Sequence, residues 1–248
     1  MAWTYRHADR VIANSEFTRD ELVKLGVVSA KITLLYPGVD LERFRPGLPH
    51  ADLNAGIGVV AGEKLIVSVG RLSRRKGFDQ VIRALPLLLE RGLTARYAVI
   101  GIGEDRDYLQ SLAGELGVSD RVHFLGHVDP EDLPRWYNAA DVVAMPNREI
   151  DGDTEGFGMV FLEAAACAKP AVAGLAGGTG AAVIDGVTGL RVDGASTQAV
   201  ADALGRLLGN AVLAEELGKK GYARALSDFS WHKVAEKTQQ LQAALRFQ

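Results

Sequence analysis

Short apolar runs alternate with longer helix-forming stretches along most of this chain. The runs mostly end at glycine and occupy residues 66–70, 98–101, 122–126, 142–145 and 171–174. Such runs are typical of buried parallel strands, because both faces of those strands are covered. Between them, segments 78–91, 106–116 and 133–140 have apolar residues at helical spacing, and 159–168 is apolar without Gly or Pro. The alternation predicts an α/β fold with a doubly wound parallel sheet.

The two ends of the chain follow a different pattern. After residues 189–193 the sequence is helical to its end, with Ser196 or Thr197 as a cap and further helices from about Ala211 and Trp231. Near the start, residues 10–13 are strand-like, residues 15–25 are helix-like, and Gly26 ends the helix. One strand and one helix cannot bury both of their faces, so we expect residues 1–30 to be a remnant of another domain.

These patterns divide the chain into four parts. Residues 31–49 are rich in Pro and Gly and predict an extended linker. Residues 50–228 form the main α/β domain. Residues 229–248 form a terminal helix, which we expect to pack back toward the domain that residues 1–30 belong to.

Composition excludes several classes of protein. The chain has 248 residues, 48% of them hydrophobic, and a formal net charge of −3, so a globular core is expected and nucleic acid is not expected as a partner. No run approaches the roughly 18 apolar residues that span a bilayer. Cys167 is the single cysteine and is expected in the core, which fits a cytoplasmic protein. A peripheral contact with the inner membrane face through the basic residues at 71–76 stays open.

The segment from Glu155 to Glu163 has the clearest chemical pattern. Gly156 and Gly158 allow the backbone to approach a ligand, and the apolar segment after them predicts a helix start, whose free N–H groups bind phosphate. The two carboxylates are then placed to accept hydrogen bonds from hydroxyl groups. The alternative is that Glu155 caps the helix and Glu163 is a solvated helix residue. The position favours a ligand site, because the helix begins between two predicted parallel strands.

Other candidate residues follow the predicted strands. Arg71 and Lys76 come after the first strand of the main domain, where basic side chains suit phosphate, although a solvated loop is the alternative. Residues 100–104 predict a turn near the site. His127 either lines a base or ribose pocket or is an ordinary surface residue. Gly177 and Gly178 form either a place where a nucleotide or sugar approaches or a plain tight turn.

Taken together, motifs between about residues 8 and 232 resemble the retaining glycosyltransferases of the group 1, family four type. The matching motifs are Ala-Asn-Ser at 13–15, Tyr-Pro-Gly-Val-Asp at 36–40, Val-Gly-Arg at 69–71, Arg-Lys-Gly at 75–77, Phe-Leu-Gly at 124–126, Ala-Ala-Asp at 139–141, Glu-Gly-Phe-Gly at 155–158 with Glu-Ala at 163–164, and Gly-Val-Thr-Gly-Leu at 186–190. Ala-Met-Pro at 144–146, with the charged loop after it, looks most like the mannosyltransferases that act on phosphatidylinositol.

The resemblance implies a GT-B fold, in which two Rossmann-like domains face each other across a cleft, and this chain would be the C-terminal, donor-binding half. The N-terminal acceptor domain would be its partner, and a GDP or UDP type sugar nucleotide its donor, without a further cofactor or a metal. By motif position, Arg71 and Lys76 would hold the diphosphate, Glu155 the transferred hexose and Glu163 the ribose. The backbone of Gly156, Phe157 and Gly158 would bind phosphate. Gly70 would line the nucleotide site, and the backbone at Gly126 and His127 would face the base.

Two departures from the family pattern change the expectation. The family usually reads Gly-Gly-x-Pro-Glu where this chain has Gly-Gly-Thr-Gly-Ala at 177–181, so a proline and a carboxylate are absent. The acceptor domain, with the histidine that the family places beside the sugar, is also absent from this sequence. We therefore expect donor binding without efficient transfer. Two alternatives stay open: a nucleotide-sugar binding module without turnover, and another enzyme of the same architecture, such as an epimerase or a sugar phosphorylase.

Overall fold

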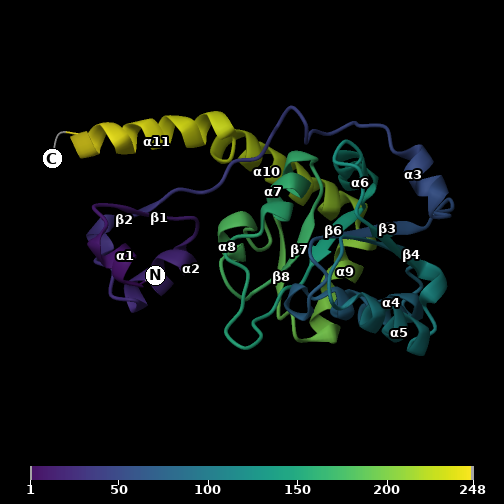
Figure 1. Cartoon of the computed structure of the whole chain (residues 1–248). Helices are drawn as coiled ribbons and strands as arrows, with labels where there is room; N and C mark the ends of the chain where they lie inside the picture. The colour runs from purple at the N-terminus through teal and green to yellow at the C-terminus, as the bar shows by residue number, and fades with distance from the viewer. Residues whose placement is uncertain (1, 247–248) are drawn as a thin grey trace.

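The main domain is built on one parallel sheet. In the computed structural model, which describes residues 2–246, six strands lie in the order β5-β4-β3-β6-β7-β8 (Figure 1). Their bounds are β3 Lys64–Val69, β4 Ala95–Ile100, β5 Val122–Gly126, β6 Val142–Met145, β7 Ala171–Gly174 and β8 Gly189–Val192. The five predicted strands are confirmed. The sixth, β8, was not predicted as a strand, and it pairs with β7 from Ala171↔Gly189 to Gly174↔Val192.

Helices cover both faces of this sheet. They are α3 Ala51–Gly56, α4 Phe78–Glu90, α5 Arg106–Glu115, α6 Leu133–Ala139, α7 Met159–Ala166, α8 Thr179–Ala182, α9 Thr197–Leu208 and α10 Ala211–Asp228. Successive residues of β6 point to opposite faces: Val142 joins the core with α4, α5 and α9, whereas Val143 joins the core with α6 and α7. The doubly wound α/β prediction is therefore confirmed.

Helix α7 ends two residues earlier than the sequence suggested. Cys167 is its C-cap and Ala168 has a positive φ of 56°, a left-handed conformation that stops the helix. The Cys167 side chain is 1% exposed, as expected for a core residue, although it lies just after the helix rather than inside it.

The strand order reverses between β3 and β6, which are neighbours in the sheet. The chain leaving β3 therefore turns toward α4 on one face, and the chain leaving β6 turns toward α7 on the other. In open α/β sheets this arrangement leaves a crevice at the carboxyl ends of the two strands, where ligands bind. The basic turn Arg74–Lys76 follows β3 and the Glu155 turn follows β6, so both predicted motifs lie at this point.

A small separate unit precedes the main domain. Helix α1 spans Ala2–His7, strand β1 Val11–Ala13, helix α2 Glu16–Lys24 and strand β2 Ile32–Leu34, with the 3-10 turn Ser29–Lys31 before β2. The predicted strand and helix are present, and Ser15 caps α2 by accepting a hydrogen bond from Thr18 N at 3.1 Å. Strand β2 pairs in parallel with β1, so residues 32–34 of the expected linker belong to this small sheet.

Few contacts join the small unit to the main domain. Ser15 Oγ donates to the carbonyl of Gly156 at 2.7 Å, and Val39 N donates to Phe229 O at 2.7 Å. Tyr36 packs its ring 6.0 Å from Phe157 and 5.8 Å from Phe229. The rings of Phe157 and Phe229 are themselves 6.1 Å apart. We call these three residues the aromatic trio.

The last helix, α11, spans Trp231–Arg246 and extends away from the end of α10 to run beside the small sheet (Figure 1). Residues Thr33, Leu34 and Leu35 share a groove with Lys237, Gln240 and Leu241 of this helix. The predicted start at Trp231 is confirmed, and Ser196 is confirmed as the cap of α9, accepting from Ala199 N at 3.2 Å. Across the described residues, no helix combines the length and the apolar character needed to cross a lipid bilayer.

Candidate functional site

A cavity of about 950 Å³ opens at the carboxyl ends of β3, β4 and β5. Four of the residues selected from the sequence line it: Gly70, Arg71, Gly126 and His127. The predicted turn at residues 100–104 forms another wall. Gly101 has a φ of 138°, and a Cβ atom there would lie 1.9 Å from Gly70 O, so the two loops pack backbone against backbone. The lining of this cavity is mostly apolar, with Val69, Ile100, Ile102, Val128 and Leu133 among its residues, which suits a flat base.

Arg71 lies at the edge of this cavity. Its side chain is 76% exposed and its Nε is 3.2 Å from Glu104 Oε2. An ion pair this exposed contributes little to stability, about 0–1 kcal/mol, and leaves the guanidinium free to exchange partners. The solvated-loop alternative therefore describes the Arg71 side chain, but it does not describe Lys76, whose side chain is 14% exposed.

A second cavity, of about 320 Å³, lies at the start of α7. Its walls include Lys76, Glu155, Gly156, Phe157 and Gly158, which are the predicted phosphate and sugar residues. Gly158 is the N-cap of α7 with a φ of 92°, and a Cβ atom there would lie 2.6 Å from the ring of Phe161. Glu155 is therefore not the helix cap. Phe161 N donates to Gly158 O at 3.0 Å, whereas the N–H groups of Met159 and Val160 precede the first bonds of the helix and carry the positive end of its dipole.

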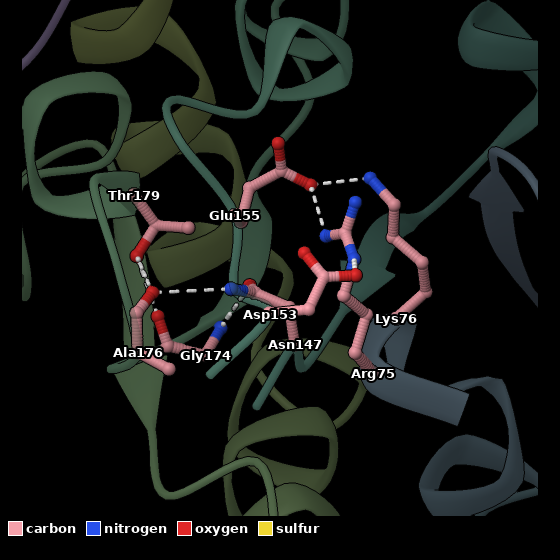
Figure 2. A network of polar contacts seen from close by, with 8 residues as sticks. All are labelled: Arg75, Lys76, Asn147, Asp153, Glu155, Gly174, Ala176 and Thr179. Atoms are coloured by element: carbon pink, nitrogen blue, oxygen red, sulfur yellow. Dashed lines mark hydrogen bonds and ion pairs between the residues drawn. The ribbon is translucent and has the colours of Figure 1, made fainter. Parts of the chain in front are cut away.

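Glu155 is surrounded by positive charge. Lys76 Nζ forms an ion pair with Glu155 Oε2, and Arg75 Nη1 lies 3.3 Å from the same oxygen. Arg75 Nε also binds Asp153 Oδ2 at 2.8 Å, and Figure 2 shows the four side chains as one network. The Glu155 carboxylate is thus the anionic partner of Lys76. Arg75 was noted in the sequence only as part of a basic cluster, because nothing local showed that its side chain bridges two carboxylates.

Glu163 lies behind the cavity surface and is not among the residues that line the two cavities. Tyr137 Oη donates to Glu163 Oε2 at 2.6 Å, so Glu163 is not a solvated helix residue. Burial raises the pKa of Glu163, while the Tyr137 hydrogen bond and the positive charge of Arg43 act in the opposite direction. Burial and the nearby carboxylate raise the pKa of Tyr137 well above its usual value, which keeps the hydroxyl protonated as the donor.

Arg43 was not selected from the sequence, yet it lines the large cavity. It belongs to the segment between β2 and α3, where Asp40 Oδ1 accepts hydrogen bonds from the N–H groups of Glu42 and Arg43 at 3.1 Å each. The Arg43 guanidinium is 5.0 Å from the ring centroid of Phe44, whose ring is 5.8 Å from that of Tyr137. The interdomain segment therefore forms part of the wall near Glu163.

The Gly177–Gly178 turn is packed tightly against the Glu155 turn. Gly178 N donates to Glu155 O at 2.7 Å, and a Cβ atom on Gly177 would lie 2.1 Å from that carbonyl oxygen. Asn147 holds the residues just before this turn. Its Oδ1 accepts from Gly174 N and its Nδ2 donates to Ala176 O, both at 3.1 Å. Thr179 Oγ1 donates to Gly174 O at 2.6 Å (Figure 2). The tight-turn interpretation accounts for both glycines.

The described residues contain no group of three or more His, Cys, Asp or Glu side chains that could hold a metal ion. The polar groups that meet at the crevice are instead cations, carboxylates and main-chain N–H groups. This set matches the parts of a sugar nucleotide, whose diphosphate is anionic and whose two sugar rings carry hydroxyls.

Known proteins share this combination of sequence and fold. Residues 52–224 match the family model of glycosyl transferases group 1, and residues 1–43 match that of glycosyltransferase family 4. The chain is 41% identical to a D-inositol 3-phosphate glycosyltransferase of Nocardia farcinica, over 92% of this chain and 51% of the relative. It is 39% identical to a GDP-mannose-dependent alpha-(1-6)-phosphatidylinositol monomannoside mannosyltransferase of Mycolicibacterium smegmatis, over 90% of this chain and 59% of the relative.

Among solved structures, Anabaena Alr3699/HepE in complex with UDP-glucose superimposes with a TM-score of 0.85 at 27% identity, over 99% of this chain and 65% of that chain. The chain thus spans between about half and two thirds of the length of these proteins.

Proposed function

The chain belongs to the group 1 glycosyl transferases, and on that premise we propose that it binds the donor of a retaining hexosyltransferase. The proposed donor is a nucleotide diphosphate sugar of the GDP or UDP type. The observation that carries the proposal is the pair of cavities at the carboxyl ends of the strands, one with a mostly apolar lining and one formed by Lys76, Glu155 and the start of α7. Their combined shape and charge fit a nucleoside in the first and a diphosphate with its sugar in the second.

In the proposed reaction the diphosphate leaves with its negative charge, so groups that bind that charge lower the barrier. Lys76, Arg71 and the first N–H groups of α7 have this role. A bound diphosphate takes the place of Glu155 beside Lys76. The Glu155 carboxylate is then available to accept hydroxyl hydrogens of the transferred hexose. The bond between the anomeric carbon and the diphosphate breaks, and a hydroxyl oxygen of the acceptor forms the new bond to that carbon while its proton passes to the departing diphosphate. The new bond forms on the same face, so the anomeric configuration is retained.

At the other end of the donor, Glu163 accepts the ribose hydroxyls. The hydrogen bond from Tyr137 occupies one carboxylate oxygen of Glu163 and leaves the other for the ligand. The main chain at Gly126 and His127 faces the base. For the sugar we propose mannose or glucose, because one relative is named as GDP-mannose-dependent and one solved relative is described with UDP-glucose.

The acceptor domain of the complete enzyme is the proposed partner. Residues 1–43 support this, since they match a separate family model and form the small unit that contacts the main domain at Gly156 and Phe157. A cytoplasmic location with a peripheral membrane contact stays part of the proposal, and fractionation of cells that express the full-length protein is its test.

Calorimetric titration of the chain with UDP, GDP and ADP tests donor binding. We expect one nucleotide to bind selectively and Lys76→Ala to weaken it by about 10- to 100-fold, the loss of one charge-assisted phosphate contact. Glu163→Ala should weaken the nucleoside monophosphate as much as the diphosphate, whereas Lys76→Ala should affect mainly the diphosphate. Lys64→Ala is the matched control, because Lys64 pairs with Asp141 at the opposite end of β3. Absence of binding at millimolar nucleotide, or equal losses in all three variants, would overturn the proposal.

One observation favours a binding module without turnover as the second candidate. Gly180 and Ala181 stand where the family usually has Pro and Glu, beside the turn that holds Glu155. Release of free hexose or transfer to an acceptor, assayed with the full-length protein, separates the two candidates. Tight nucleotide binding with no product over hours would favour the module.

A further inference from the structure

A third cavity, of about 410 Å³, lies between the small unit and the main domain. Glu16, Phe17 and Tyr36 line one side of it. The other side consists of glycines and alanine from the 177–181 turn, together with Ile184 and the side chains of Arg191 and Arg224. None of these residues lines the two donor cavities. The third cavity is therefore a distinct space with two guanidinium groups in its wall.

Arg191 is incompletely paired in this wall. Its Nη2 donates to Leu175 O at 3.1 Å and to Thr179 Oγ1 at 3.2 Å. Its Nε is buried and has no hydrogen-bond partner among residues 2–246. A guanidinium has five N–H donors, and a buried donor without an acceptor is unfavourable. Arg191 is therefore under-satisfied, and its Nη1, which lies beside the cavity-lining Gly180 and makes no hydrogen bond within residues 2–246, is the donor that a ligand in the cavity meets first.

The local sequence explains why no carboxylate of the chain fills this place. Gly180 makes room for the guanidinium, since a Cβ atom there would lie 2.9 Å from Arg191 Nη1. Ala181 lines the cavity at the position where the resemblance described above has glutamate. Asp185 is near, but its Oδ1 accepts the main-chain N–H of Arg191 at 2.8 Å.

The other charged groups of the wall already have partners. Arg224 donates to Ala181 O at 2.7 Å and to Ala182 O at 3.0 Å, and its Nε is 3.5 Å from Asp228. Glu16 accepts a hydrogen bond from the hydroxyl of Tyr36. Arg224 therefore holds the end of α8 in place and adds positive charge, while the donors available to a ligand are those of Arg191.

We infer that this cavity binds a phosphate group, separate from the donor diphosphate, through Arg191 with the charge of Arg224 behind it. Guanidinium groups match phosphate oxygens in geometry and charge. The three glycines of the turn let a bulky oxyanion approach the main chain, and the cavity also has room for an attached alcohol. A ligand in this cavity touches both residues 1–43, which match the glycosyltransferase family 4 model, and the main domain. This position favours a phosphorylated alcohol that belongs to the acceptor over free phosphate.

The test follows the arginine Nε–H signals of the full chain by NMR while inorganic phosphate, and in a second series glycerol 3-phosphate, is added without nucleotide. Arg191→Gln identifies the Arg191 signal by its loss. We expect this signal to shift on titration, and phosphate affinity to fall at least about tenfold in Arg191→Gln, the loss of one charge-assisted hydrogen bond. Tighter binding of the ester identifies an acceptor group as the source, and equal binding identifies free phosphate.

A second pair of variants keeps the test valid if Arg191→Gln does not fold. Ala181→Glu places a carboxylate in the cavity, so phosphate binding should disappear, whereas the neutral Ala181→Gln has nearly the same size and should retain part of it. Phosphate binding that persists in Ala181→Glu, an Arg191 signal that does not respond, or binding that is lost in Lys76→Ala instead would overturn the inference. UDP and GDP titrations of Arg191→Gln, Ala181→Glu and Ala181→Gln should be unchanged, which separates this result from a failure of the proposed donor site.

Discussion

Removal of the Tyr137 hydroxyl tests the role of Glu163, because it deletes the hydrogen bond to that carboxylate. Tyr137 is fully buried, and its hydroxyl has one strong partner, Glu163 Oε2 at 2.6 Å. Tyr137→Phe deletes a single oxygen and leaves the packing of the ring unchanged. A hydrogen bond to a charged group contributes about 1.5–3 kcal/mol, which sets an upper limit of about 10- to 150-fold on the loss of nucleotide affinity. We expect about tenfold, because Arg43 still compensates the carboxylate.

The same variant should change the pH dependence of binding. Burial raises the pKa of Glu163, and the Tyr137 hydrogen bond partly opposes this, so Tyr137→Phe raises that pKa further. The ribose hydroxyls need an ionised acceptor, so affinity falls as pH falls through the raised pKa, and in the variant it should begin to fall at a higher pH. Stability has the opposite sign. A carboxyl with a raised folded-state pKa is penalised when ionised, so the free energy of unfolding decreases as pH rises from the unfolded pKa through the folded one.

The assay is calorimetric titration of the selected nucleotide between about pH 5 and 8, with urea unfolding at the same pH values. Tyr97→Phe is the matched control: Tyr97 is also fully buried, and its hydroxyl donates to Ser68 Oγ at 2.8 Å, away from Glu163. The reasoning is refuted if Tyr137→Phe binds the nucleotide as the wild type does over the whole range, or if Tyr97→Phe shifts the pH profile equally.

Three further predictions concern the supports of the site. Gly177→Ala should destabilise the fold by about 1 to 3 kcal/mol more than the control Gly186→Ala in urea unfolding. Both glycines have a φ of 68°, but only at Gly177 would the new Cβ lie 2.1 Å from a backbone oxygen, that of Glu155. Equal losses would exclude this contact as the cause. Asn147→Ala leaves the N–H of Gly174 and the carbonyl of Ala176 without their buried partner, so we expect a loss of about 2 to 4 kcal/mol in urea unfolding, and a loss below about 0.5 kcal/mol would show that these groups find other partners. Burial raises the pKa of the Cys167 thiol to about 12, so it should react with a thiol reagent only as fast as the protein unfolds, and rapid labelling of the native protein would contradict its burial.

The local sequence was sufficient to predict strands that are buried on both faces and helix caps whose partners lie nearby in the chain. Strands β6 and β7 are continuous apolar runs because helices cover both of their faces, and Ser15 and Ser196 are polar caps whose partners lie three residues away. Strands β2 and β8 were not predicted. Strand β2 is short and only partly buried, and β8 contains Gly and Arg beside its apolar residues. Both are held by hydrogen bonds to another strand, β1 or β7, which the pattern within the strand itself does not reveal.

The site divides in a similar way. Lys76 and the Glu155 turn were each predicted as part of a ligand site that follows a parallel strand, and they form an ion pair there. Arg43 comes from a segment before the first strand of the sheet, so no strand-end argument could place it in the large cavity. The unpaired Nε of Arg191 is visible only after folding, since it depends on the space beside Gly180.

The aromatic trio has a mechanical consequence. Phe157 lies between the two glycines of the turn that is proposed to bind phosphate. Its ring is 6.0 Å from that of Tyr36, which belongs to the segment that connects the small unit to the α/β sheet. Phe229, the third ring, is the residue from which the long final helix departs. A rotation of the small unit about this connection would therefore displace the ring of Phe157 and the donor turn with it. In the proposed enzyme, closure of its two halves and alignment of the donor diphosphate would then be one coupled motion rather than two successive ones.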